Sequence, residues 1–456
     1  MTLHVDSKKG RVQTAETVAY RSGDALSREL HGRALQVMPG GNSRHSIALA
    51  PYPIYAKSGE GCRITDAEGE ERIDFINNFT SLILGHAHPE VSKAVCSRVD
   101  LGTAFAMPTE ADVELAELLV ERIPGVEQLR FCNSGSEAVL LAVRAARAFT
   151  GKTKIAKFEG AYHGLYDYVQ VSELPHPDRW GKPEAPASVI EPSISPNVPH
   201  EVIVLPWNNF AACRQLISEN ASHLAAVVVD PLPAGIGFLS PHQGFLELLR
   251  DETVHHNILL IADEVMSLRL SYHGAFSRNG LRPDLVCLGK IIGGGFPVGA
   301  IGGSRSIMSV FDHTSNPKVH HGGTFNANPV TMTAGATTLK VMTPEAYDRL
   351  NGMGDYLREQ LTRMLADHRI PSQVSGEGSL FAVHLTSQAL IDFRSLVLCS
   401  HTPSVSDKLC HELLARGIVI SPRGVGGSLS TPMTTADLDI FVDAVKKSLL
   451  AVSYKA

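Results

Sequence analysis

The sequence predicts an α/β protein with a mostly parallel β-sheet, followed by a smaller α+β domain. Between about residues 129 and 288, short apolar runs alternate with helix-length segments, the pattern of repeated strand–helix–strand units. After about Pro329 the pattern changes to long helices with scattered strands. The 456 residues suffice for two or three domains with full cores. The expected division is an N-terminal segment over 1–75 that packs with the small domain, a large domain over 76–330 and the small α+β domain over 331–456.

Composition narrows the functional classes. Only 19% of residues are charged and the net charge is −6, which argues against a nucleic-acid or anionic-membrane partner. No apolar run reaches 18 residues, so we expect no membrane span. The first ten residues are polar and lack the apolar core of a signal peptide, so we expect a cytoplasmic protein. The seven scattered cysteines contain no CxxC pair, which fits a reducing compartment and predicts no metal site.

The N-terminal segment is expected to contain one helix and one β-hairpin. Leu26, Leu30, Ala34 and Val37 recur at helical spacing, and Pro39-Gly40-Gly41 ends that helix. The remaining elements expected before the sheet are hairpin strands over 62–66 and 71–75 and a helix over 89–98.

The large domain carries the strongest strand signals. Strands are expected over 129–132, 154–158, 202–205, 225–229, 258–262 and 284–288, with a helix over 136–149. Residues 173–200 hold seven prolines and no period. A segment of that length is usually a lid, an interface arm or a disordered stretch, and the sequence leaves all three open.

The C-terminal region alternates less regularly. The elements expected there are helices over 331–342, 344–367, 405–416 and 436–452, and strands over 373–374, 379–385 and 417–421.

One lysine stands at the end of a predicted buried strand, where an apolar or small residue would be expected. Lys290 ends an apolar run of strand length and is followed by Gly293-Gly294-Gly295. A buried lysine is costly unless its amine is neutral or covalently used, and a Schiff base provides such a use. In isolation, an ordinary lysine at a strand end would be the better interpretation.

Three other strand exits carry polar groups. Asn133-Ser-Gly-Ser-Glu137 fits a capping box and equally a phosphate cradle at a helix N-terminus. Asp263-Glu264-Val265 offers a carboxylate that could pair with a pyridine nitrogen, although a lone aspartate is more often a cap or an ion-pair partner. Tyr162-His163-Gly164 offers a ring for stacking, although such an aromatic is more often core. With Lys290 they make four polar strand exits, which is unlikely to be coincidence.

With these motifs the chain resembles the class III (ornithine/ω-type) aminotransferases of pyridoxal-phosphate fold type I. The resemblance extends from about residue 30 to the C-terminus. It rests on Asn133-Ser-Gly-Ser-Glu-Ala138, Tyr162-His-Gly164, Asp263-Glu-Val-Met266 and Gly289-Lys-Ile-Ile-Gly-Gly-Gly295. It implies a large domain with a mostly parallel seven-stranded-type sheet and a small α+β domain.

The resemblance also implies a role for each motif residue. Lys290 is expected to be the Schiff-base lysine and proton shuttle, and Asp263 the partner of the ring nitrogen. Thr324, in Gly322-Gly-Thr-Phe-Asn326, is expected to reach the phosphate of the partner subunit, which implies a homodimer with shared active sites. The other cofactor-binding residues implied are Ser134, Gly135 and Ser136 at the phosphate, Tyr162 and Val265 on the two ring faces, and His163.

Two segments resemble one branch of the family. Met38-Pro-Gly-Gly-Asn-Ser-Arg44 and Asp263–Met266 look like the branch of glutamate-1-semialdehyde aminomutases and β-amino-acid aminotransferases. Aminomutases carry Glu-Pro-x-x-Gly-Asn before the aspartate strand. Here Asp230-Pro-Leu-Pro-Ala-Gly235 lacks both the glutamate and the asparagine.

Two arginines are the expected substrate contacts. Ser421-Pro-Arg-Gly424 resembles the arginine-bearing turn of the β-amino-acid aminotransferases. By that resemblance Arg44 would hold the carboxylate of a β-amino acid and Arg423 that of the keto-acid acceptor. A guanidinium is the best fork for a carboxylate, although loop arginines are more often surface or ion-pair residues.

The expected activity is transfer of an amino group from an amino acid, expected to be a β-amino acid, to a keto acid such as 2-oxoglutarate or pyruvate. The alternatives are a 2,1-aminomutase, an ω-amine transaminase, a pyridoxal-phosphate decarboxylase or epimerase, and a non-catalytic cofactor-binding regulator. The missing asparagine counts against the aminomutase, and the absence of a basic DNA-binding module counts against the regulator.

Overall fold

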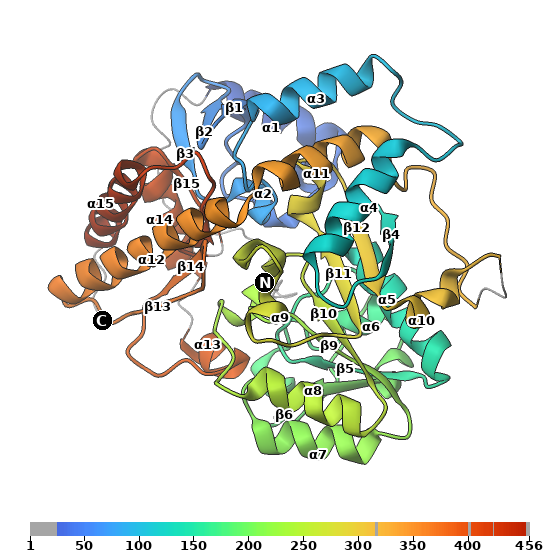
Figure 1. Ribbon diagram of the computed structural model, residues 1–456. Helices are drawn as coiled ribbons and strands as arrows, with labels where there is room; N and C mark the ends of the chain where they lie inside the picture. Colours follow the sequence, from blue (N-terminus) through green and yellow to red (C-terminus); the bar gives the residue numbers. More distant parts are fainter. Residues whose placement is uncertain (1–24, 315–317, 400–402, 423, 453–456) are drawn as a thin grey trace.

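The computed structural model, which describes residues 25–314, 318–399, 403–422 and 424–452, centres on a seven-stranded sheet (Figure 1). Its strand order is β4-β12-β11-β10-β9-β5-β8, and β12 alone runs antiparallel to its neighbours. The predicted mostly parallel sheet is therefore confirmed. In that order the strands are Gln128–Cys132, Gly299–Gly303, Leu285–Gly289, Leu259–Asp263, Leu224–Val229, Lys154–Phe158 and Val202–Leu205.

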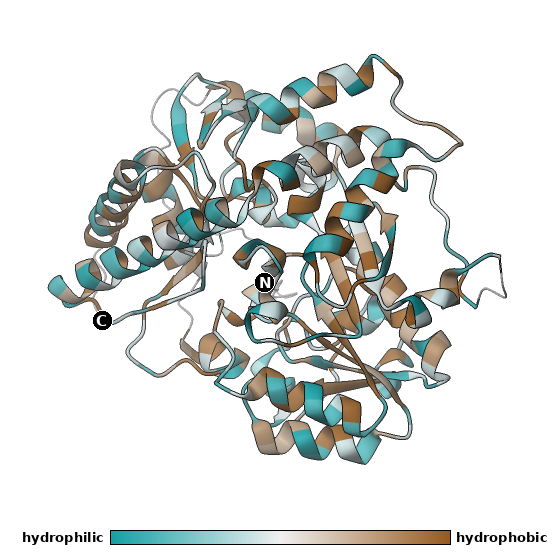
Figure 2. Cartoon of the chain, in the orientation of Figure 1, coloured by the Kyte–Doolittle hydropathy of each residue, from teal (hydrophilic) through white to brown (hydrophobic). Residues whose placement is uncertain are grey.

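Helices cover both faces of this sheet, which is why its central strands β9, β10 and β11 are largely apolar. Every residue of β9 is buried. The cores on the two faces are formed with α5 on one side and with α7 and α8 on the other. Figure 2 shows the central strands mainly in brown, whereas α7 and α8 mix teal and brown. The helices of this region are α4 Glu110–Arg122, α5 Gly135–Thr150, α6 Asp167–Gln170, α7 Phe210–Asn220, α8 Phe245–His255, α9 Ala275–Arg278 and α10 Arg305–Met308.

The two ends of the described chain share one core. Strand β15 (Ile418–Val419) pairs in parallel with β3 (Glu71–Asp74), and β3 continues the antiparallel pair β1 (Ala56–Glu60) and β2 (Arg63–Asp66). Phe75 stacks on Phe441 with ring centroids 4.2 Å apart and meets Phe381 edge-on. The other elements are α1 Ala25–Val37, α2 Asn77–Thr80, α3 Pro89–Val99, α11 Pro329–Val341, α12 Pro344–Asp367, α13 Phe393–Cys399, α14 Pro403–Ala415, α15 Thr435–Ala451, β13 Gln373–Ser375, β14 Leu380–His384 and β16 Gly426–Ser428.

The segment 173–200 packs against the rest of the molecule. It contains the short hairpin of β6 (Gly181–Lys182) and β7 (Ala185–Pro186). Trp180 is buried, and its indole N–H donates to the Pro175 carbonyl at 2.8 Å. Arg394 of α13 donates to the Trp180 carbonyl and forms a bidentate pair with Glu159. A disordered segment, one of the three options considered, is therefore ruled out.

No helix in the described ranges is both long enough and apolar enough to cross a membrane.

Candidate active site

Three neighbouring strands bring their polar exit residues together. Val229 and Ala262 are paired in the parallel β9–β10 ladder, so Asp230 and Asp263 follow as adjacent residues at the same sheet edge. Because paired residues on neighbouring parallel strands point to the same face, these two carboxylates lie on one side of the sheet. Lys290 directly follows β11, the next strand. This edge, the carboxyl end of the parallel strands, is where ligands bind in α/β sheets.

Lys290 is held with its amine partly withdrawn from water. Its φ of +48° is in the left-handed region, which a non-glycine residue rarely adopts. Burial lowers the pKa of the Lys290 amine; the Arg269 guanidinium adds to this, while Asp263 and Asp230 oppose it. The glycines after it allow the tight turn: a Cβ on Gly294 would lie 2.5 Å from the Ala334 carbonyl oxygen of α11. A lowered pKa favours the neutral amine that Schiff-base formation requires.

Asp263 is fixed by two hydrogen bonds. One carboxylate oxygen accepts from the Val265 amide at 3.1 Å and the other lies 2.7 Å from His163 Nδ1. His163 is 2% exposed, and its Nε2 has no hydrogen-bond partner among the described residues. His163 therefore lies against Asp263, an arrangement that nothing in its spacing along the sequence could have revealed. The adjacent Glu264 instead accepts from two backbone amides at the start of α9.

Asp230 is a site residue that the sequence did not predict. It is 7% exposed and accepts a hydrogen bond from the Leu232 amide at 2.9 Å. Burial raises the pKa of the Asp230 carboxyl well above its ordinary value, Asp263 and Glu264 raise it further, and Lys290 opposes them. Two adjacent buried carboxylates do not both ionise readily. Burial beside a second carboxylate therefore favours the protonated form of Asp230 more than in an exposed aspartate.

The N-terminus of α5 adjoins these groups. Ser134 caps the helix by accepting from the Glu137 amide at 3.2 Å, and Glu137 accepts from the Asn133 amide at 2.6 Å. Ser136 Oγ accepts from the Leu165 amide at 3.2 Å, which ties the helix to the turn after β5. The capping interpretation thus holds, and the first-turn amides remain oriented as an anion site would need them.

Val265 connects this helix end to Lys290. A Cβ on Gly135 would lie 2.7 Å from Val265 Cγ1, and a Cβ on Gly289 would lie 3.1 Å from the same atom. The two glycines therefore keep open the space around Val265 between the helix end and β11. This arrangement fits pyridoxal phosphate: an amine in Lys290, a carboxylate in Asp263, an apolar side chain for the ring and a helix N-terminus for the phosphate.

Tyr162 and Thr324 lie in exposed positions. Tyr162, in the turn after β5, is 51% exposed. Thr324 precedes α11 and lines an open cavity of about 630 Å³ with residues 104–108. Its loop touches the α5 end of its own chain, because Asn326 Oδ1 accepts from Asn133 Nδ2 at 2.7 Å. The reach of Thr324 into a second subunit stays a prediction.

The two substrate arginines differ in what the structure describes. Arg44 is exposed, donates through Nη1 to Asn78 Oδ1 at 2.9 Å, and lies over the Phe79 ring at 5.8 Å. Arg423 lies outside the described residues, so its role stays a prediction.

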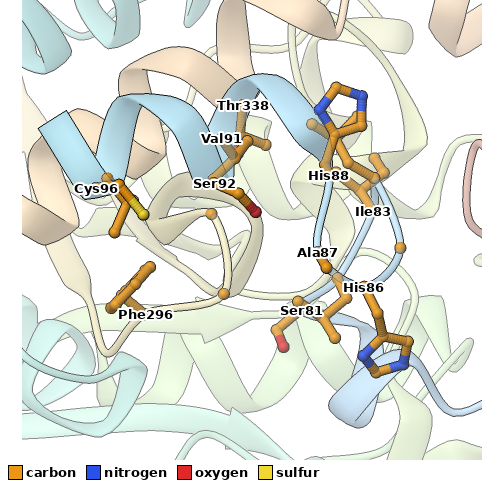
Figure 3. Close-up of a pocket in the computed structure, with 16 residues that line it drawn as sticks. Ser81, Ile83, His86, Ala87, His88, Val91, Ser92, Cys96, Phe296 and Thr338 are labelled. Carbon is orange, nitrogen blue, oxygen red and sulfur yellow. The ribbon is translucent and has the colours of Figure 1, made fainter. Parts of the chain in front are cut away.

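A second cavity of about 330 Å³ lies beyond the glycine turn (Figure 3). Figure 3 shows Cys96 and Phe296 on one side and Ala87 and His88 on the other. Gly294 and Gly295 also line it, but none of the predicted cofactor residues does. This cavity is therefore separate from the site around Lys290.

Comparison with known proteins adds an independent finding. The sequence model of the family described as aminotransferase class-III matches residues 47–449. Glutamate-1-semialdehyde 2,1-aminomutase of Methanothermobacter thermautotrophicus is 41% identical, with 87% of this chain and 92% of the relative covered. The ω-transaminase of Sphaerobacter thermophilus has a TM-score of 0.91 at 45% identity, over 96% of this chain and 100% of that one. The β-phenylalanine aminotransferase of Variovorax paradoxus has a TM-score of 0.85 at 35% identity, over 94% of each chain.

Proposed function

Because the chain belongs to the class III aminotransferases, whose members depend on pyridoxal phosphate, we propose that it transfers the amino group of a β-amino acid to a keto acid. The observation that supports a β-amino acid as the amino donor concerns Arg44. Among the residues the structure describes, this arginine makes no ion pair, so its charge is available for a substrate carboxylate. The likeness to a β-phenylalanine aminotransferase supports the same class.

Different residues of the chain have different roles in the proposed reaction. Bound pyridoxal phosphate supplies an electron sink for the bond that breaks at the amine-bearing carbon. Lys290 would hold the cofactor covalently between turnovers and would move the proton at that carbon. Asp263, whose carboxylate is fixed by His163, would pair with the ring nitrogen. Val265 and Tyr162 would cover the ring faces, and the N-terminus of α5 would hold the phosphate.

The proposal extends to the acceptor and the assembly. Arg423 would bind the carboxylate of 2-oxoglutarate or pyruvate. The enzyme would act as a cytoplasmic homodimer in which Thr324 reaches the partner's cofactor phosphate. Exposed apolar side chains near its loop support an interface there, namely Leu101, Phe105, Met107 and Phe325 at 70%, 49%, 78% and 61% exposure.

A second candidate is a 2,1-aminomutase acting on glutamate 1-semialdehyde. The 41% identity to a protein of that name favours it. Asp230-Pro-Leu-Pro-Ala-Gly235 disfavours it, since the glutamate and asparagine of the aminomutase motif are absent.

A panel of amino donors separates these candidates. β-Phenylalanine, β-alanine, ω-amines and α-amino acids are assayed against 2-oxoglutarate and pyruvate. The proposal expects the highest kcat/KM with a β-amino acid. Turnover of glutamate 1-semialdehyde without any keto acid, and none of β-amino acids, would establish the aminomutase instead.

A further inference from the structure

Helix α2 is one turn of left-handed helix made without glycine. Asn77, Asn78, Phe79 and Thr80 have φ values of +49°, +47°, +54° and +73°. L-residues avoid this region because Cβ crowds the following carbonyl, and left-handed residues normally occur singly. Four in succession persist only where the surroundings over-determine them, and such strain is concentrated at functional sites.

Buried groups anchor both ends of this turn. At its start, Asp74 accepts from the Asn77 amide at 3.0 Å, and Asn77 Nδ2 donates to the Ser428 carbonyl at 2.7 Å. At its end, the fully buried Arg269 donates to the Thr80 carbonyl at 2.8 Å. The strained backbone is therefore fixed from the core outward.

The two middle residues of the turn point away from the core and hold Arg44. Asn78 Nδ2 donates to Ser81 Oγ at 3.0 Å, which orients the amide so that Oδ1 faces Arg44 Nη1 at 2.9 Å. The Phe79 ring supports the guanidinium from one side, with 5.8 Å between Arg44 Cζ and the ring centroid. No hydrogen bond to Nε or Nη2 of Arg44 is found within the described part of the chain.

The turn is also coupled to the surroundings of Lys290. Arg269, which anchors Thr80, is close enough to Lys290 to lower the pKa of its amine. One buried guanidinium thus lies between the strained turn and the cofactor lysine. The turn that contacts Arg44 is thus anchored by a guanidinium whose charge also acts on Lys290.

We propose that the left-handed turn 77–80 is a specificity device, in which Asn78 is a positioning residue that fixes Arg44 for a substrate carboxylate. By engaging Nη1, Asn78 leaves Nε and Nη2 as a fork for bidentate binding. The neutral amide of Asn78 orients the guanidinium and leaves its charge uncompensated. An aspartate at this position would instead cancel that charge. The inference rests on the proposed function, because it requires Arg44 to be the carboxylate contact of the donor.

The test compares Asn78→Gly with two other variants of the holoenzyme. Glycine keeps the left-handed conformation accessible while it removes the acceptor. We expect KM for a β-amino acid to rise about tenfold, the scale of one charge-assisted hydrogen bond, with kcat little changed. KM for an ω-amine without a carboxylate, and for the keto acid, should not change. Asn257→Gly, at another exposed asparagine with φ of +52°, is the matched control and should leave every constant unchanged.

Arg44→Ala separates failure of the inference from failure of the proposed function. If Arg44→Ala leaves KM for β-amino acids unchanged, the role that the proposed function gives to Arg44 is wrong and the inference fails with it, whereas the proposed function itself fails only if β-amino acids are not turned over at all. If Arg44→Ala raises that KM but Asn78→Gly does not, only the inference fails. An equal loss on carboxylate and carboxylate-free donors in Asn78→Gly would show a merely structural turn and also overturns it.

Discussion

Three titratable groups, Asp230, Asp263 and Lys290, act on one another at the exits of β9, β10 and β11. Asp263 accepts from His163 and from the Val265 amide. Asp230 has one backbone donor and the charge of Asp263 beside it. The raised pKa of the Asp230 carboxyl therefore lessens the negative charge that acts on the Lys290 amine.

The raised pKa of Asp230 makes stability depend on pH. A group whose folded pKa exceeds its unfolded value contributes stability that is fully present below pH ~4 and lost as pH rises through the folded pKa. We expect the Tm of the cofactor-free protein to fall with rising pH across that window. The fall should be smaller in Asp230→Asn, which cannot ionise and can still accept from Leu232.

The control for that measurement is Asp251→Asn, a change at an exposed aspartate of α8. Its Tm should follow that of the wild type at every pH. Parallel curves for Asp230→Asn and the wild type would mean that folding does not raise the pKa of Asp230, which would contradict this prediction.

At the scale of single elements, the sequence predicted the bounds of strands most accurately where the strand residues are buried without interruption. The strands β5 and β8 occur with the bounds expected, because an uninterrupted apolar run has one interpretation in a doubly covered sheet. β12 was missed because it is built from glycine, alanine and one isoleucine, so its turn-like composition hid an extended strand. A Cβ on its Gly299 would lie 2.0 Å from the Ser134 carbonyl oxygen, so close packing dictates that composition.

Other features were not expected because they depend on long-range contacts. Helices α4, α7 and α8 were also not expected, although their hydrophobic periodicity is similar to that of α1 and α15, which were. The contact of His163 with Asp263 joins residues 100 positions apart. Asp230 follows a strand as Asp263 does, so its position was a usable signal, but only the sheet register shows that the two are neighbours.

The α5 N-terminus gives a prediction at the same scale. Gly135→Ala would place a Cβ 2.7 Å from Val265 Cγ1 and displace that side chain into the cofactor space. Overpacking of this kind costs roughly 1–3 kcal/mol, so we expect the Kd for pyridoxal phosphate to rise about tenfold. Spectroscopic titration of the apoenzyme measures it.

The matched control is Gly352→Ala in α12, where no atom lies within 4 Å of the added Cβ. This variant should bind the cofactor as the wild type does. If Gly135→Ala also keeps the wild-type Kd, then Gly135 does not border the cofactor.

At the scale of the whole molecule, the proposed dimer predicts complementation between inactive variants. Thr324→Asp should repel the phosphate of the partner's cofactor, and Lys290→Ala removes the covalent anchor. When the two inactive proteins are mixed and exchange subunits, each mixed dimer contains one complete site, so activity should reappear. Native mass spectrometry confirms the exchange, and mixed dimers that remain inactive would contradict shared active sites.

The central claim, that Lys290 anchors the cofactor, can be tested on the protein directly. Lys157 is the natural competitor, because it is fully buried and burial lowers the pKa of its amine to about 7. Its Nζ, however, donates to the carbonyls of Phe158 and Val171 at 3.0 and 2.8 Å. Borohydride reduction of the holoenzyme, followed by peptide mass spectrometry, locates the lysine that carries the cofactor. We expect the label on Lys290, and a label on Lys157 or any other lysine would show that Lys290 does not anchor the cofactor.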